Sequence, residues 1–204
     1  DDGLFLAYAV ANYVKISGDR QILDETAAYL DSPCLAATEE SRFEIPKYHD
    51  KRESVLMHLE RIIERAYDVG ENGLLKIRGG DWLDPVNLAG LEGRGESVML
   101  TCQVILGLGY MAELCEKLNR DTQKTEEYKK LIPKFKDNLC KYALNKKGYF
   151  NSVFNDDGKW LFSDCDPDGK ERPYGPANWY PIACHAVPKD KLDGVFAVMD
   201  LLKC

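Results

Sequence analysis

Two acids lie three residues apart around a tryptophan in the stretch GGDWLDPVNLAG, residues 79–90. Asp81 and Asp84 flank Trp82, and the surrounding glycines predict a loop whose backbone can approach a ligand closely. An indole beside carboxylates suits a sugar, because its flat face covers the apolar side of the ring while the acids bond hydroxyls or protonate an oxygen. The competing interpretation is structural: Asp81 caps a turn and Trp82 belongs to the core. Spacing alone leaves both open.

The charge and hydropathy of the chain exclude several classes of partner. Lys and Arg number 27 against 34 Asp and Glu, which gives a formal net charge of −7. The basic residues are scattered, whereas nucleic acid needs a concentrated positive face. The apolar fraction of 45% is that of a soluble globular domain. The apolar runs fall short of the ~18 residues of a membrane span, and no signal peptide is recognisable. We therefore expect neither nucleic acid nor a membrane among the partners.

The cysteines and the chain ends bear on location and extent. The 204 residues hold seven cysteines with no CxxC spacing, and three of them lie inside apolar helical patterns. This usage predicts reduced thiols in the cytoplasm. The first residue is Asp rather than Met, and helical patterns run at both ends. We expect residues 1–204 to form one domain that is a piece of a larger catalytic chain.

Helical periodicity dominates the sequence. Residues 97–117 are apolar almost all round the helical wheel, whereas 125–144 have one apolar stripe and a lysine-rich back. A helix that is apolar all round is buried on all sides, and a striped helix faces water, so two layers of helices are predicted. Pro133 should kink the outer helix or mark strain in it. The remaining expected elements are helices over 4–17, 21–30, 55–66, 176–187 and 191–203, a Pro-punctuated loop over 31–50 and a short β-hairpin over 148–164.

Three blocks of the chain carry a family resemblance. Residues 73–100 read GLLKIRGGDWLDPVNLAGLEGRGESVML and resemble the pattern GLPLIGxGDWNDxxN…GKGESVW. Residues 1–25 resemble DDLLWLPxAVAxYVxxTGDxxILDE, and residues 148–164 and 177–187 resemble GWYxRAYxDDGxPLGS and QSWAVLSGVA. These patterns are typical of the inverting β-glycoside phosphorylases, the cellobiose phosphorylase and cyclic β-1,2-glucan synthase family (glycoside hydrolase family 94).

The resemblance implies a fold and a reaction. The implied fold is all-α, part of an (α/α)6 barrel of helical hairpins, with the β-hairpin as an excursion. The implied reaction is inverting phosphorolysis of β-linked glucosides or β-glucan oligosaccharides to a sugar 1-phosphate, for which the isolated piece is expected to be inactive. No cofactor is implied, and inorganic phosphate is the co-substrate. The expected partners are the oligosaccharide, phosphate and the rest of the same chain, with a homodimer as a further option.

The resemblance also assigns roles by position. The last acid of the family's GDWND motif is the general acid, which here is Asp84. Trp82 would line the sugar subsite, and Asn87 would order the loop or contact substrate. Asp81 is a further substrate-binding candidate, and its charge would raise the pKa of the neighbouring acid. Three more candidates follow from the matched blocks and, for the last, from the family's EGxI segment: Arg94, Glu96 and Glu171.

Some positions depart from the family pattern. Leu83 stands where the family usually has Asn, and residues 163–179 replace its usual GS…EGxI…QSW segment. The acceptor sugar and the linkage are therefore left open. Asp1 and Asp2 match the family's DD pair, and favourable charge at a helix N-terminus explains them equally well.

The sequence is also compatible with two other functions, and one segment resembles the start of a metal site. An inverting hydrolase on the same barrel would need a second carboxylate roughly 6.5 to 9.5 Å from Asp84 to activate water. A carbohydrate-binding helical domain without catalysis is the third reading. Residues 164–169, DCDPDG, open like a calcium loop, but Gly175 occupies the twelfth position where Glu is required. The three histidines form no zinc spacing, His58 is expected to be a hydrogen-bonded core residue, and no metal is predicted.

Overall fold

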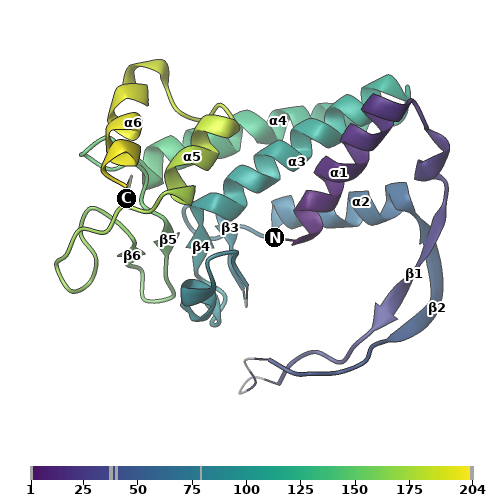
Figure 1. Cartoon of the computed structure of the whole chain (residues 1–204), viewed down its shortest axis with the longest axis horizontal. Coiled ribbons are helices and arrows are strands. Elements are labelled where there is room, and N and C mark those ends of the chain that lie inside the picture. The colour runs from purple at the N-terminus through teal and green to yellow at the C-terminus, as the bar shows by residue number, and fades with distance from the viewer. Residues whose placement is uncertain (1, 37–38, 40, 79, 203–204) are drawn as a thin grey trace.

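The computed structural model describes residues 2–36, 39, 41–78 and 80–202, except for the side chains of Asp2 and Asp84. Its α-helices are Asp2–Ser17 (α1), Val55–Ile63 (α2), Val98–Lys117 (α3), Thr122–Asn138 (α4), Pro176–Ala183 (α5) and Leu192–Leu201 (α6) (Figure 1). Its strands are Thr26–Asp31 (β1), Lys47–Ser54 (β2), Leu75–Lys76 (β3), Glu96–Ser97 (β4), Val153–Phe154 (β5) and Trp160–Leu161 (β6). Short helical turns cover Gln21–Leu23 (η1), Glu64–Tyr67 (η2), Asp84–Gly90 (η3), Leu139–Ala143 (η4) and Lys189–Lys191 (η5).

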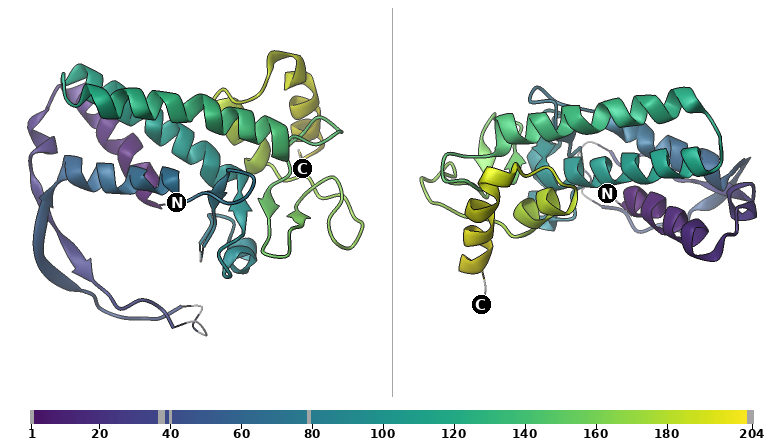
Figure 2. Two further views of the ribbon diagram at one scale, coloured as in Figure 1. Left: turned by 180° about the vertical axis from the view of Figure 1, so that it is seen from behind. Right: turned by 90° about the horizontal axis from the view of Figure 1, so that it is seen from above.

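Helix α3 is the centre of the molecule, as its uniformly apolar sequence predicts. Helices α1, α4 and α5 all pack against it, and α4 returns beside it after a short turn (Figure 2). Ser97 caps the helix, since its hydroxyl accepts a hydrogen bond from the Leu100 N–H at 3.1 Å. Most of the α3 residues are buried, including Val98, Leu108 and Met111. Its burial between neighbouring elements is thus confirmed.

The same helix corrects one expectation about membranes. By length and composition α3 is apolar enough to cross a bilayer, so the apolar runs are not all too short. In this structure 78% of its most apolar stretch is buried inside the molecule. A helix enclosed by other helices and a sheet has little surface left for lipid, and its apolar character is accounted for by the core.

Helix α4 forms the outer layer. Its first turn is capped by Asp121, whose carboxylate accepts a hydrogen bond from the Lys124 N–H at 2.9 Å. Tyr128 and Phe135 face the core from the predicted apolar stripe. The helix continues through Pro133 to Asn138, and the ribbon of α4 is continuous along its length (Figure 2). The stripe is confirmed at Tyr128 and Phe135, and the kink at Pro133 stays a prediction.

Two antiparallel sheets overturn the expected fold class. Strands β1 and β2 pair with each other, and β3, β4, β5 and β6 form a second sheet in that order. The hairpin expected over 148–164 is present as β5 and β6, but two further strands extend it. Strands β3 and β4 are joined by residues 77–95, which include the GGDWLDPVN segment. An all-α chain, as part of an (α/α)6 barrel of helical hairpins, is therefore wrong.

The helix expected over 21–30 is also wrong. Only the short turn η1 is helical there, and strand β1 follows it. β1 pairs with β2, which begins inside the expected 31–50 loop and ends at Ser54. Thr26 pairs with Ser54 and Asp31 with Lys47. Long-range pairing satisfies the backbone of both segments, and it outweighs the weak local helix preference of ETAAYL. The two strands project from the helices as a curved arm (Figure 1).

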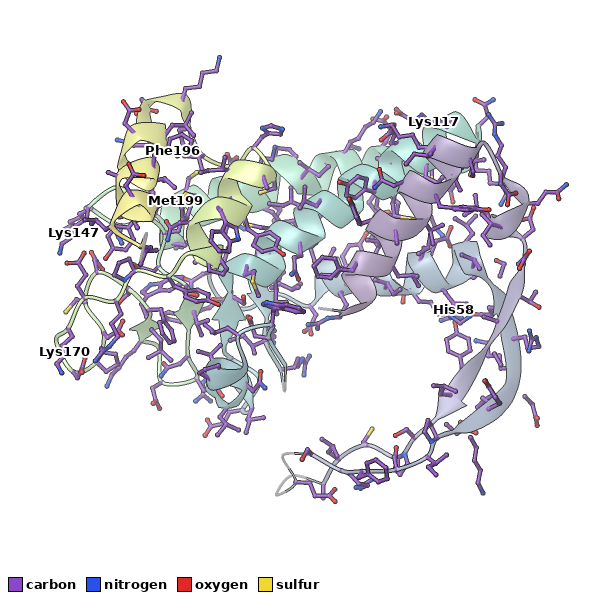
Figure 3. All side chains as sticks on the ribbon, in the orientation of Figure 1. His58, Lys117, Lys147, Lys170, Phe196 and Met199 are labelled. Atoms are coloured by element: carbon purple, nitrogen blue, oxygen red, sulfur yellow. The ribbon has the colours of Figure 1, made fainter. Side chains whose placement is uncertain are left out.

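The arm is anchored on α2 by a charged cluster. Glu53 is held by the Arg61 guanidinium at 2.5 and 2.8 Å and by the Tyr29 hydroxyl at 2.5 Å. Lys51 Nζ lies 2.9 Å from the same carboxylate. His58, at the junction of arm and helices (Figure 3), lies 3.1 Å from the Ala27 carbonyl oxygen, which agrees with its predicted hydrogen bond, but it is half-buried and not a core residue.

We predict that Glu53→Gln loosens the arm. The Arg61 guanidinium, then the Tyr29 hydroxyl, hold the pKa of Glu53 well below its usual range. A lowered pKa contributes stability above the usual value of about 4.3, and this stability is lost as the pH falls below it. Amide hydrogen exchange over 26–54, corrected for intrinsic rates, should be several-fold faster in the variant at pH 7. The difference should shrink on acidification.

The matched control is Glu64→Gln, which removes an exposed carboxylate outside the arm. It should leave exchange in the arm unchanged. Equal exchange in the wild type and Glu53→Gln at pH 7 would show that the cluster does not hold the arm.

Candidate functional site

The segment between β3 and β4 is folded back on itself by local hydrogen bonds. The Asn87 side-chain oxygen accepts from the Asp81 N–H at 3.1 Å, and Asp81 Oδ1 accepts from the Leu83 N–H at 2.9 Å. Val86 is buried against Ile77, the residue that follows β3, and against Val153 of β5. Asn87 therefore orders the loop, which is one of the two roles predicted for it.

Asp81 is a buried acid with one unpaired oxygen. Its side chain is only 5% exposed, and Oδ2 has no hydrogen-bond partner within the described part of the chain. Burial raises the pKa of Asp81, against the opposing effects of the Leu83 N–H and the Ser97 hydroxyl. The pKa of Tyr174 is raised mainly by burial and, to a smaller extent, by the nearby charge of Asp81. The acid thus lies between the α3 N-terminus and the segment that leads into α5.

Trp82 faces solvent, although its neighbours are buried. The residue is 62% exposed, and its ring centroid lies 6.4 Å from that of Phe5 on α1. The structural interpretation is met in one part and wrong in the other: Asp81 caps a turn by accepting from the Leu83 N–H, but Trp82 does not belong to the core. An exposed indole on an ordered loop offers a flat apolar face to a ligand.

Asp84 opens the helical turn η3 and is followed by Pro85, which suits a first helical position. The side chain of Asp84 lies outside the described residues, as does the whole of Asp1. Its backbone position places it one helical turn from Asn87 and three residues from Asp81. The predicted role of Asp84 as general acid stays a prediction.

Residues 92–95 are fixed by a single carboxylate from the β5–β6 turn. Asp156 accepts hydrogen bonds at 2.8 Å from the backbone N–H groups of Glu92, Arg94 and Gly95. Burial alone would raise the pKa of Asp156, but these three donors hold it below its usual range. The Arg94 guanidinium donates to the Asp156 carbonyl oxygen at 2.8 Å and pairs with Glu92 at 2.6 Å. Arg94 therefore has a structural role in this loop.

Glu96 is fully buried and also structural. Its carboxylate accepts from the Asn72 amide at 2.6 Å and from the Leu74 N–H at 3.0 Å. A Cβ on Gly70 would lie 2.6 Å from this side chain, so the absence of a side chain there makes room for the acid. Burial raises the pKa of Glu96, against the hydrogen bonds from Asn72 and Leu74.

Glu171 accepts its hydrogen bonds from residues outside the 77–95 loop. It accepts from the Tyr149 hydroxyl at 2.7 Å and from Lys147 at 2.6 Å, and the Lys147 contact leads in lowering its pKa. Arg172 binds Asp168 through two nitrogens at 2.7 Å and Asp166 at 3.0 Å. Among the described residues no group of three His, Cys, Asp or Glu side chains is placed to hold a metal ion.

Two residues escaped sequence reasoning. Asp156 was visible only as part of an Asp-Asp-Gly turn, and its three contacts lie more than 60 residues away. Gln103 is buried in α3 with both side-chain polar atoms unpaired within the described chain. A lone carboxamide in the apolar run VMLTCQVILGL was the signal for it.

The family is decided by a match over most of the chain. The model of the "Glycosyl hydrolase 94 superfamily, catalytic domain" matches residues 1–170. This chain belongs to the glycosyl hydrolase 94 superfamily. The match covers α1, the 77–95 loop and the β5–β6 hairpin, so the elements that build the site are family elements.

Three proteins with similar sequences have names that refer to the synthesis or phosphorolysis of glycans. The glycosyl hydrolase 94 chain is 38% identical over 101 residues to the cyclic beta-(1,2)-glucan synthase NdvB of Rhizobium meliloti (strain 1021), covering 49% of the chain. It is 27% identical over 173 residues to the solabiose phosphorylase of Paenibacillus borealis, covering 83% of the chain. It is 30% identical over 105 residues to the 3-O-beta-D-glucopyranosyl-beta-D-glucuronide phosphorylase of the same organism, covering 52%. The matched segments span only 4%, 20% and 13% of these relatives.

The close packing of Gly95 yields one prediction about the loop. A Cβ at this position would lie 2.5 Å from Gly90 Cα and 2.6 Å from the Ala89 carbonyl oxygen. Because backbone cannot move aside as a flexible side chain can, Gly95→Ala should destabilise the protein by about 1–3 kcal/mol. Urea unfolding measures the change. A Cβ on Gly80 meets nothing within 4 Å, so Gly80→Ala is the matched control. Equal stability of the two variants would contradict the packing described.

The buried acid yields a pH-dependent prediction. Because the pKa of Asp81 is raised in the folded state, its favourable contribution is complete below the usual value of about 3.9 and is lost as the pH rises through the folded pKa. Asp81→Asn keeps the acceptor for the Leu83 N–H and removes the charge. Its melting temperature should therefore rise relative to the wild type between pH 4 and pH 8. The exposed Asp157→Asn serves as control and should show no such trend. A difference independent of pH would rule out a buried charge.

Proposed function

We propose that the protein to which this chain belongs catalyses inverting phosphorolysis of β-linked glucosides, with Asp84 as the general acid. Family membership supports this proposal, as do two relatives that are named phosphorylases. The observation that carries it is the exposed Trp82 indole beside the buried Asp81 on a loop held by the sheet and by Asp156. The open face of the indole is available to a sugar ring, which supports the proposal.

The reaction needs only one acid. The proton of Asp84 passes to the glycosidic oxygen while the bond from that oxygen to the anomeric carbon breaks. A phosphate oxygen forms the new bond to the anomeric carbon from the opposite face, which gives a sugar 1-phosphate of inverted configuration and a free sugar. Water would require a second carboxylate to activate it, whereas phosphate is already an anionic nucleophile.

The loop supplies the remaining roles. The Trp82 face would cover the apolar side of a sugar ring, and the Asp81 carboxyl would bond a hydroxyl or favour the protonated form of Asp84. Backbone hydrogen bonds hold Asp81 and Asn87 in place, and preorganisation of this kind supports catalysis because less reorganisation accompanies the reaction. The phosphate-binding groups would come from other parts of the full protein.

We predict that Asp84→Asn lowers the rate of phosphorolysis roughly 10²- to 10⁴-fold in the full-length protein, the usual contribution of general acid catalysis. The shape of the side chain is kept, but the proton is lost. The assay incubates enzyme, inorganic phosphate and a panel of β-glucosides, and quantifies sugar 1-phosphate. Asp50→Asn, an exposed acid on the β1–β2 arm, is the control and should keep full activity.

Two outcomes would refute parts of the proposal. Sugar release that is equally fast without phosphate would identify a hydrolase instead. Full turnover by Asp84→Asn would show that another group is the general acid.

A further inference from the structure

Asp156, in the turn between β5 and β6, holds the segment that carries the proposed general acid. Its carboxylate accepts hydrogen bonds at 2.8 Å from the backbone N–H groups of Glu92, Arg94 and Gly95, which connect η3 to β4. Its own N–H donates to the carbonyl oxygen of Ala89, in the last turn of η3, also at 2.8 Å. One residue thus binds both the end of η3 and the connection that follows it.

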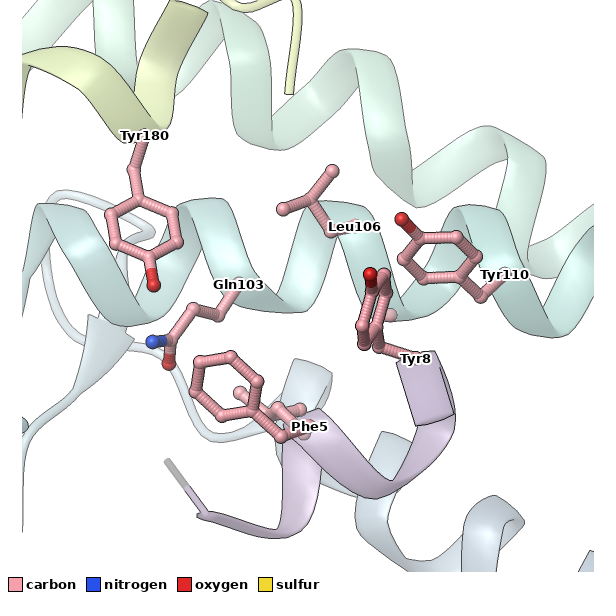
Figure 4. Close-up of a pocket in the computed structure, with 8 residues that line it drawn as sticks. Phe5, Tyr8, Gln103, Leu106, Tyr110 and Tyr180 are labelled. Atoms are coloured by element: carbon pink, nitrogen blue, oxygen red, sulfur yellow. The ribbon is translucent and has the colours of Figure 1, made fainter. Parts of the chain in front are cut away.

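The start of this segment is held by other contacts. The Asn87 side chain accepts from the Asp81 N–H at 3.1 Å, and Val86 is buried. The Trp82 ring lies beside Phe5, which projects from α1 (Figure 4), with ring centroids 6.4 Å apart. These contacts lie at or before Asn87, so they leave the end of η3 to be held elsewhere.

The turn η3 needs an attachment at each end. It is a 3₁₀ helix of seven residues, Asp84–Gly90. Runs longer than three or four residues are uncommon in this conformation, because its hydrogen bonds have poorer geometry than those of an α-helix. Leu88 and Leu91 are exposed, so burial of these two side chains contributes little to holding the end of the turn. The hydrogen bonds to Asp156 therefore supply the second attachment.

The attachment requires a carboxylate. One oxygen of Asp156, Oδ1, accepts from the Arg94 and Gly95 N–H groups, and Oδ2 accepts from the Glu92 N–H. Burial raises the pKa of Asp156, but the three N–H donors together hold it below its usual range. The amide of an Asn has one acceptor oxygen, so in its place at least one backbone N–H would lose its partner and face an NH₂ group. Asp156→Asn thus keeps the size of the side chain and loosens the attachment.

We infer that Asp156 is a positioning residue for the proposed general acid, because it fixes the end of η3 and thereby the backbone at Asp84, where η3 begins. The inference rests on the proposed function, which assigns the proton transfer to Asp84. Asp156 acts through the backbone and not through contact with the substrate. A misplacement of about 1 Å can slow a reaction roughly 10²-fold, so even a small relaxation of η3 should be measurable.

This role predicts that the effect of losing Asp156 depends on the leaving group. A sugar leaves as an unstable alkoxide unless it receives a proton, so its departure needs the general acid. 2,4-Dinitrophenolate is a stable anion, and it leaves without a proton as the phosphate oxygen bonds to the anomeric carbon. A misplaced acid slows only the first reaction, whereas a general fault in folding or in phosphate binding slows both.

The test measures steady-state kinetics of the full-length protein with inorganic phosphate. Sugar 1-phosphate is quantified with sophorose, laminaribiose and cellobiose, and dinitrophenolate release with 2,4-dinitrophenyl β-D-glucopyranoside. For the disaccharide that the wild type uses best, Asp156→Asn should lower kcat roughly 10- to 100-fold, with a smaller change in KM. The same variant should release dinitrophenolate at close to the wild-type rate.

Asp157→Asn is the matched control, since Asp157 is the next residue of the same turn and is exposed. It should behave as the wild type does with both substrates. An equal loss with both substrates in Asp156→Asn would overturn the inference, and so would wild-type kinetics with the disaccharide. If Asp156→Asn does not fold, Asp156→Glu decides, because it keeps both acceptor oxygens but displaces them by one methylene. It should then show the same dependence on the leaving group.

The positioning role and the proposed function fail in different ways. Asp84→Asn should also slow the disaccharide and spare the dinitrophenyl glucoside, because it removes the proton. If Asp84→Asn shows this dependence and Asp156→Asn does not, the reaction stands and the positioning role is wrong. If Asp84→Asn does not show it, Asp84 is not the general acid, and the positioning role is overturned with that assignment.

Discussion

The whole arrangement depends on the burial of helix α3. A helix that is apolar all round has to be covered on every side, and α1, α4, α5 and the β3–β4 pair provide that cover. Thr101 of α3 accepts a hydrogen bond from the Leu75 N–H at 2.8 Å, which ties the sheet to the helix. The loop with Asp81 lies at the N-terminus of α3, and Gln103 lies about one and a half turns further along the helix. One core helix thus positions both features.

The site combines a hydrogen-bonded backbone with side chains that lower the stability of the fold. Asp156 accepts hydrogen bonds from three backbone N–H groups of the loop, and Asn87 accepts one from a fourth, at Asp81. Beside these bonds the chain keeps groups that do not favour folding: an exposed indole and a buried acid with an unpaired oxygen. Natural chains break the rules of packing mainly where function requires it. In this chain the two departures, the exposed Trp82 and the unpaired Asp81 oxygen, lie next to each other in the 77–95 loop.

The sequence pattern predicted those features that depend on interactions between neighbouring residues. The periodicity of α1, α3 and α4 and the Asp-Asp-Gly turn of the β5–β6 hairpin follow from neighbouring residues, and these predictions were confirmed. The arm was missed because Thr26 pairs with Ser54, and no local signal encodes a partner so distant. The motif located the candidate loop, and the family resemblance was confirmed. The burial of Asp81 and the contacts of Asp156 depend on tertiary packing, which spacing does not report.

The arm also affects the chain entropy of folding. Helices α1 and α2 lie side by side, and the Glu25 carbonyl oxygen accepts from the Val55 N–H at 2.8 Å at the base of the arm. Closing an unstructured loop of that length would cost about 3 kcal/mol plus a constant. When β1 and β2 zip together from their turn, the ends of the loop are already adjacent, and this loss is offset by ladder hydrogen bonds. A projection that adds little to the core thereby eases the assembly of two helices that belong to it.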